Sequence, residues 1–245
     1  MKRLTNIFLI IVLISFSFEV IASHKIYILH GYASSKSIMN RIKKDLKKSG
    51  FLVENYDYPA LYVDLDSLGK KLYLDVLEDN YDSVSFVTHS MGGLVVRNMV
   101  KYSAADLNFP KIYRIVMIAP PNQGADIADF FKKNKCNRKI LGPNVEKMRT
   151  DSMSYANLLP APINTEIGII VGKSKHKAGF NWFIGKKNDG LLIPERVHLG
   201  NEKDIATFNK SHIGVVKRKK PREAVVKFMK FGKFNVENNT DSISP

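Results

Sequence analysis

Short apolar runs alternate with amphipathic stretches along the chain, and this alternation predicts a wound α/β structure. The apolar, β-branched runs that predict strands are residues 25–30, 51–58, 84–88, 112–119 and 166–172. Apolar residues at helical spacing predict helices through residues 38–46, 65–76 and 91–102, and a closing helix from Pro221 to Gly232. Strands that alternate with helices are joined by right-handed crossovers. We therefore expect a mostly parallel central sheet with helices on both faces.

The stretch between the last two predicted strands interrupts this alternation. Residues 126–162 are too many for a plain connection, and their apolar side chains are dispersed among lysines and polar residues. We interpret this stretch as part crossover helix and part small cap, inserted at about residues 125–162. An ordinary crossover with an extra surface loop is the alternative.

The first residues have the layout of an export signal. Met1-Lys2-Arg3 is positively charged, residues 7–18 are apolar, and small residues follow up to Ser23. The apolar run is shorter than the roughly 20 residues of a membrane span, which favours cleavage near Ala22 over an anchor. We expect a signal peptide at residues 1–22, one domain at 23–234, a polar tail at 235–245, and a periplasmic or secreted protein.

Composition limits the partners and cofactors of this domain. The only cysteine is Cys136, so no intramolecular disulfide can form, and no motif suggests a metal or another cofactor. The formal net charge of +15 indicates an anionic surface as a partner, although a lysine-rich surface can also serve solubility alone. Nucleic acid fits less well, because the cations are not interleaved with stacking aromatics. The sequence predicts no oligomeric state.

Ser90 is the candidate nucleophile. The predicted strand 84–88 runs into His89-Ser90-Met91-Gly92-Gly93 and then a helix, which is the context of a nucleophile elbow. The strand and helix pass closely at such a turn, so small neighbours are needed. Gly92 meets this need and Thr88 does not, which predicts a widened or strained elbow. A serine that only caps the helix is the alternative.

A serine hydroxyl needs a base to remove its proton and an acid to orient that base. In the chain order serine, acid, histidine, the candidate bases are His212, in a loop before the closing helix, and His198, which resembles part of a strand or its end. We favour His212. The candidate acid is Asp189, followed by Gly190 in a loop, whereas Glu166 and Glu195 are less suited; Asp-Gly is also a common turn pair.

Acyl transfer also requires donors for the oxyanion that develops on the carbonyl. His30-Gly31-Tyr32 follows the first predicted strand, and Gly31 allows a close turn. The backbone amides of Tyr32 and Met91 are therefore the predicted oxyanion hole.

In their order along the chain, several motifs resemble those of bacterial lipases and esterases of the α/β-hydrolase superfamily. These motifs are His30-Gly31, His89-Ser90-Met91-Gly92-Gly93-Leu94-Val95-Val96-Arg97, Ala119-Pro120-Pro121-Asn122-Gln123-Gly124, Asn188-Asp189-Gly190 and Ser211-His212. The resemblance covers essentially the whole chain after the signal. It implies the α/β-hydrolase fold, a Ser-Asp-His triad, and ester hydrolysis through an acyl-enzyme without a cofactor. Thr88 and the small cap depart from the pattern of large-lidded lipases.

The substrate is less closely defined by the sequence than the chemistry is. An acyl or lipid ester is the leading hypothesis; an acyltransferase with the same triad and a non-catalytic binding module are the alternatives. The aromatic residues that could line an acyl pocket, or simply belong to the core, are Phe130, Phe131, Phe180, Trp182 and Phe183. Basic residues cluster at 132–139 and 217–222, which suggests that the active-site face docks on anionic lipid or handles an acidic substrate.

Overall fold

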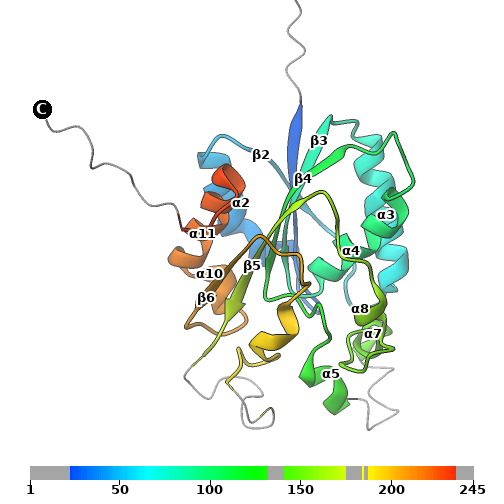
Figure 1. Cartoon of the computed structure of the whole chain (residues 1–245), viewed down its shortest axis with the longest axis vertical. Helices are drawn as coiled ribbons and strands as arrows, with labels where there is room; N and C mark the ends of the chain where they lie inside the picture. Colours follow the sequence, from blue (N-terminus) through cyan, green and yellow to red (C-terminus); the bar gives the residue numbers. More distant parts are fainter. Residues whose placement is uncertain (1–22, 132–140, 175–183, 185–186, 236–245) are drawn as a thin grey trace, which may run out of the picture.

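A six-stranded, entirely parallel sheet forms the centre of the protein (Figure 1). The computed structural model describes residues 23–131, 141–174, 184 and 187–235. The strands are β1 (His24–Leu29), β2 (Leu52–Tyr56), β3 (Ser83–His89), β4 (Lys111–Ile118), β5 (Glu166–Gly172) and β6 (Asp204–Phe208). Their order in the sheet is β2-β1-β3-β4-β5-β6. The predicted parallel sheet is therefore confirmed.

Helices cover both faces of this sheet. The longer helices are α2 (Asn40–Lys48), α3 (Leu65–Glu78), α4 (Gly92–Ser103) and α11 (Lys219–Phe231), and the shorter ones are η1 (Lys36–Met39), α5 (Asp126–Phe131), α7 (Asn144–Lys147), α8 (Tyr155–Leu158), η2 (Pro194–Val197) and α10 (Gly214–Lys217). Figure 1 shows α2, α10 and α11 on one side of the sheet and α3 and α4 on the other. None of the helices in the described ranges has the length and apolarity that crossing a membrane requires.

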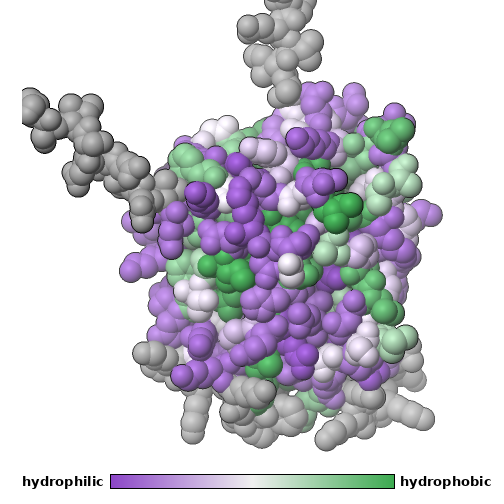
Figure 2. Space-filling model, viewed as in Figure 1, coloured by the Kyte–Doolittle hydropathy of each residue, from purple (hydrophilic) through white to green (hydrophobic). Residues whose placement is uncertain are grey.

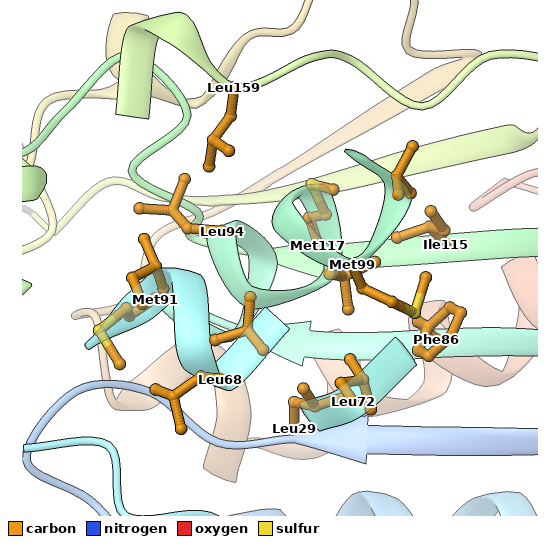
Figure 3. Packing of buried hydrophobic residues seen from close by; sticks show 14 of the residues in the cluster. Leu29, Leu68, Leu72, Phe86, Met91, Leu94, Met99, Ile115, Met117 and Leu159 are labelled. Carbon is orange, nitrogen blue, oxygen red and sulfur yellow. The ribbon is translucent and has the colours of Figure 1, made fainter. Parts of the chain in front are cut away.

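The two faces of each central strand enter two separate hydrophobic clusters. Successive strand residues point to opposite faces, so Ile26 and Ile28 of β1 join the cluster under α2 and α11, whereas Tyr27 and Leu29 join the one under α3 and α4. Figure 3 shows the second cluster, where Leu68 and Leu72 of α3 face Leu94 and Met99 of α4 above the sheet. Burial on both faces explains why the central strands read as continuous apolar runs.

The stretch between β4 and β5 packs on the cluster under α3 and α4. It contributes Ala125, Ala128, Met148, Ala156 and Leu159 to that cluster, and its described helices are the short α5, α7 and α8. Figure 1 shows α5 and α7 at the end of the molecule toward which the strands run. The described part of this stretch therefore consists of short helical turns with their own contacts to the core.

Two local predictions were wrong. Strand β6 was not anticipated, because it lies at the edge of the sheet, where partly buried and exposed residues alternate without an apolar run. His198 was interpreted as part of a strand or its end, yet it follows η2, and its Nδ1 lies 2.6 Å from Glu202 Oε1. The predicted end of the closing helix is confirmed, since Gly232 follows α11 with a φ of 68° and its N–H donates to Phe228.

Several predictions concern residues outside the described ranges. These residues are the signal segment 1–22, the basic cluster 132–139 with Cys136, the aromatic residues Phe180, Trp182 and Phe183, and the tail from residue 236 onward.

Gly168 in β5 allows α11 to approach the sheet, which predicts the effect of a single added methyl group. A Cβ at this position would lie 2.6 Å from Phe228 Cε2 and 2.7 Å from Phe234 Cζ. We expect Gly168→Ala to lower the free energy of unfolding by about 1–3 kcal/mol through overpacking, as measured by denaturant unfolding. Combining it with Phe228→Leu should cost less than the sum of the two single changes. Additive losses would show that the two residues do not compete for space.

Candidate active site

The site lies where the winding of the sheet changes direction. β1 is flanked by β2 on one side and by β3 on the other, so the connections that leave β1 and β3 diverge and open a crevice at their carboxyl ends. A cavity of about 190 Å³ occupies this crevice. Gly31 and Tyr32 line it from the end of β1, Ser90 from the end of β3, and His212 from the loop after β6.

Ser90 occupies a sharp turn between β3 and α4. Its φ is 53°, a left-handed conformation that is strained for a residue with a Cβ. Neighbouring backbone holds it there, because the Ser90 N–H donates to Ile118 O at 2.9 Å and the Ser90 carbonyl accepts from Gly93 N–H at 2.9 Å. The strand, turn and helix expected of a nucleophile elbow are present.

Glycines make this turn sterically feasible. A Cβ at Gly92 would lie 2.6 Å from His30 O, and one at Gly31 would lie 2.9 Å from Ser90 Cβ. Thr88 is fully buried, and a Cβ at Gly93 would lie 3.4 Å from its Oγ1. Gly93 therefore helps to make room for the threonine where small residues were expected.

Asp189 is the acid that the structure brings to His212. Its side chain is 1% exposed, and its Oδ2 lies 2.6 Å from His212 Nδ1. Oδ1 accepts hydrogen bonds from the N–H groups of Leu191 and Leu192 at 3.0 and 3.1 Å. The buried carboxyl oxygens are thus both hydrogen-bonded, which avoids the cost of burying an unpaired polar group.

His212 is fixed by its backbone as well as by its ring. Its N–H donates to the carbonyl oxygen of Asp189 at 2.8 Å, parallel to the contact between the two side chains. Because Nδ1 faces the carboxylate, Nε2 is the nitrogen left for the serine. In the described part of the chain Ser90 and His212 share the cavity without a direct hydrogen bond. Such bonds are often long in ligand-free enzymes and tighten when substrate binds.

Gly172, the last residue of β5, allows these two loops to meet. A Cβ there would lie 2.8 Å from Asp189 Cβ and 2.9 Å from Lys210 O. The loop that carries Asp189 and the loop that leads to His212 therefore both pass against this glycine.

The candidate oxyanion donors are the backbone amides of Tyr32 and Met91. Tyr32 lines the cavity, and its hydroxyl donates to the carbonyl of Leu141, which anchors the side chain away from its own amide. Met91 is fully buried and caps α4. Amides at a helix start lack acceptors within the helix and favour a negative charge. The Met91 amide is thus suited to receive an oxyanion.

The other acids and the alternative histidine lie elsewhere. His198 is exposed and contacts Glu202, and it lines a different cavity from Ser90. Glu166, at the start of β5, is paired with Arg114 at 2.6 Å and also with Lys203. Glu195 is exposed in η2. The structure thus brings Asp189 alone of the three candidate acids against His212.

Apart from Tyr32 and the two histidines, the large side chains that line the described wall of the cavity are not aromatic. Ile127, Met148, Leu191 and Leu192 line it, together with the exposed Ile213 at its mouth. The rings of Phe130 and Phe131 contact each other at 5.3 Å between centroids, and among the described residues they do not line this cavity. The expectation that these two phenylalanines form an acyl pocket is therefore not supported by the described residues.

His89 contacts His212, and this contact was not foreseen from the sequence. Its ring centroid is 4.7 Å from that of His212, and its Nε2 lies 3.1 Å from His212 O. A carbonyl only accepts, so Nε2 carries the hydrogen. Burial, with His212 and His30 nearby, holds the pKa of His89 well below its ordinary value of 6.5. The signal available in the sequence was its position between a buried strand and the nucleophile.

Arg97 in α4 was likewise not recognised as a separate feature. Its buried guanidinium donates to the carbonyls of Asn122, Ala156, Leu159 and Pro160. Burial lowers the pKa of Arg97 to about 10, so the group is still charged at neutral pH. It fastens the chain after α8 to the helix that begins at the elbow.

Within the described ranges, no cluster of three or more histidine, cysteine or acidic residues could hold a metal ion. The structure places Ser90 and the buried His212 at one cavity, and the buried carboxylate of Asp189 lies against His212. Residues of these types, held in this way, are suited to activating a serine hydroxyl as a nucleophile.

Comparisons with known proteins agree with this geometry at the level of the fold. A family model described as a domain of unknown function (DUF7379) matches residues 23–141, which include the Ser90 elbow but not Asp189 or His212. A search of curated proteins found no match.

Three solved structures illustrate the likeness. The mature lipase BlEst2 of Bacillus licheniformis is 20% identical with a TM-score of 0.67, over 88% of this chain and 94% of that one. The metagenomic carboxyl esterase MGS0156 is 15% identical with a TM-score of 0.59, over 78% and 65%. An extracellular alpha/beta-hydrolase from a Paenibacillus species is 14% identical with a TM-score of 0.54, over 84% and 98%. The TM-scores establish a shared fold, and at identities this low the likeness establishes the fold alone.

The buried hydroxyl of Thr88 predicts a stabilising substitution. Within the described residues, its Oγ1 has no hydrogen-bond partner. Thr88→Val keeps the shape and removes the unsatisfied group, so we expect the free energy of unfolding to rise by about 1 kcal/mol in denaturant titrations. Thr88→Ser keeps the hydroxyl, loses a buried methyl and should be less stable than the wild type. A destabilised valine variant would show that the hydroxyl has a partner.

The lowered pKa of His89 predicts how stability depends on pH. As the pH is lowered from about 7.5 to about 5.5, the unfolded chain binds a proton at this residue and the folded chain does not. The free energy of unfolding therefore decreases by up to about 1.4 kcal/mol for each unit by which the pH is lowered. In His89→Gln, whose amide can still donate to His212 O, this contribution is absent. Denaturant unfolding across this range should give a flatter curve for the variant. Parallel curves would contradict the prediction.

Proposed function

We propose that this chain, which has the α/β-hydrolase fold of the lipases and esterases that it resembles in structure, hydrolyses carboxylic esters with Ser90 as nucleophile. The observation that carries the proposal is the buried contact of 2.6 Å between Asp189 and His212, beside the cavity that Ser90 lines. If the contact between Asp189 and His212 served stability alone, it would not require the nearby Ser90 to adopt a strained, positive φ.

In the first half of the proposed reaction, His212 Nε2 takes the proton of Ser90 Oγ as this oxygen bonds to the ester carbonyl carbon. The amides of Tyr32 and Met91 receive the negative charge that moves to the carbonyl oxygen. When the tetrahedral intermediate collapses, the ester C–O bond breaks, and the alcohol leaves with the proton from His212. Ser90 now carries the acyl group.

In the second half, water replaces the alcohol. His212 takes a proton from water, the hydroxide adds to the acyl carbon, and the carboxylic acid leaves as Ser90 regains its proton. Throughout the cycle Asp189 stabilises the imidazolium form of His212 and keeps the proton on Nδ1. The two amides that bind Asp189 Oδ1 keep its carboxylate oriented toward the ring.

The cavity supports a preference among esters. Its volume of about 190 Å³ is below the range of roughly 300–1,000 Å³ that is usual for drug-sized ligands, and its described wall is largely aliphatic. We therefore propose that short acyl chains are preferred. An acyltransferase would use the same residues with an alcohol in place of water, and product analysis with and without an added alcohol distinguishes the two.

Chromogenic esters of increasing acyl length test the proposal. We expect turnover to decline for long chains, and Ser90→Ala to lower kcat by about 10⁴-fold or more. Asp189→Asn should lower it by about 10²–10⁴-fold, because the ring loses its orienting charge. Tyr32→Phe serves as the control and should change kcat by no more than about threefold, since the amide and not the hydroxyl donates to the oxyanion.

Two results would contradict the proposal. Equal turnover by the wild type and Ser90→Ala would exclude Ser90 as the nucleophile. A large loss in Tyr32→Phe with normal stability would assign catalysis to the phenol and remove the basis for the predicted oxyanion hole.

A further inference from the structure

The two helical layers of the protein differ in charge. Helix α2 contains five lysine and arginine residues and one acid, and α11 also contains five and one. On the opposite face, α3 contains two lysines and three acids. Because α2, α10 and α11 cover the same side of the sheet, the cations gather there (Figure 1). We define these three helices and Arg218, which joins α10 to α11, as the basic face.

Few of these cations are neutralised by neighbours. Arg222 pairs with Asp45 at 2.7 Å, and Lys219 lies 3.5 Å from Glu223. Within the described part of the chain, the cations of the basic face without an ion pair are Arg41, Lys43, Lys44, Lys47, Lys48, Lys217, Arg218, Lys220, Lys227 and Lys230. Nearly all of them are exposed. Their mutual repulsion is relieved when an anionic partner covers the face.

A trough runs along the middle of the basic face. It has a volume of about 580 Å³ and lies between the end of α2 and the first half of α11. Its charged lining consists of Lys48 and Lys227 and of two ion pairs, Arg222 with Asp45 and Lys219 with Glu223. The trough and its rim therefore present ammonium groups over an extended area and not at a single point.

The composition of this face fits a membrane surface better than a nucleic acid. Most of its cations are lysines, whose hydrated ammonium groups attract an anionic surface without requiring a fixed geometry. Binding of single strands relies on exposed aromatics between the cations; α2 and α10 contain none, and α11 exposes only Phe231. On the side that Figure 2 shows, hydrophilic residues predominate and hydrophobic ones are scattered in small groups.

The basic face begins at the rim of the active-site cavity. Ser34 and Ile213 line the cavity, η1 starts at Lys36, and α10 starts at Gly214. The guanidinium of Arg41 in α2 donates to the carbonyl of Lys217 in α10 at 3.4 Å, which links the helix that follows η1 to α10. A surface that covers the basic face would therefore border the mouth of the cavity.

We propose that the basic face docks the protein on an anionic phospholipid surface. Docking is electrostatic, so it requires acidic lipid and weakens as salt screens the charges. It is independent of the proposed ester hydrolysis, because binding needs no turnover.

Sedimentation of the full chain with vesicles tests this docking. Ser90→Ala is used throughout so that lipid is not consumed. We expect binding to mixed phosphatidylcholine and phosphatidylglycerol vesicles at low salt, release at high salt, and no binding to pure phosphatidylcholine. Lys44→Glu with Lys227→Glu, on the basic face, should weaken binding about tenfold or more. The matched control, Lys70→Glu with Lys111→Glu, makes the same change in net charge away from this face and should weaken it no more than about twofold.

The same two pairs of substitutions, made with Ser90 intact, should turn over soluble esters like the wild type, which verifies that both fold. Equal weakening of vesicle binding by both pairs would overturn the proposal, because net charge and not the basic face would then govern binding. So would salt-insensitive binding, binding to neutral vesicles, or binding to duplex DNA without binding to anionic vesicles.

Discussion

The buried contact between Asp189 and His212 joins the two loops on which the proposed chemistry depends. The loops follow β5 and β6, and they are linked twice, through the side chains and through the His212 N–H to the Asp189 carbonyl. Both side chains are almost completely shielded from water. A buried pair of this kind is stable only when its remaining polar atoms are satisfied, which the amides of Leu191 and Leu192 achieve for the carboxylate.

This contact depends on glycines at the ends of the strands, where neighbouring segments pass too close for a side chain. Gly172 leaves space for both loops, and Gly31 and Gly92 leave space for the elbow at Ser90. The strained φ of Ser90 is maintained by hydrogen bonds to Ile118 and Gly93. The close packing at the ends of the parallel strands therefore requires glycine at these positions around the site.

Charge is distributed unevenly between the two helical layers of the fold. The layer with α2 and α11 carries cations with few partners, whereas acids of the opposite layer form local networks such as Asp66 with Lys101, Tyr102 and Tyr155. These contacts hold the pKa of Asp66 far below its usual range. Acids in one layer are thus paired locally, whereas most cations in the other layer have no acidic partner among the described residues.

The sequence by itself determined the parallel sheet, the elbow and the identity of Ser90, Asp189 and His212 as candidates, because each depends on local signals: apolar runs, glycines and turn chemistry. It could not place β6, whose edge position removes the apolar pattern, nor foresee that His89 contacts His212, since that contact joins residues far apart in the chain. Only the tertiary structure showed that His212, which the sequence already favoured over His198, lies against Asp189, and that cations from two distant helices gather on one face. Both outcomes follow from packing across the sheet, a long-range effect that no local pattern encodes.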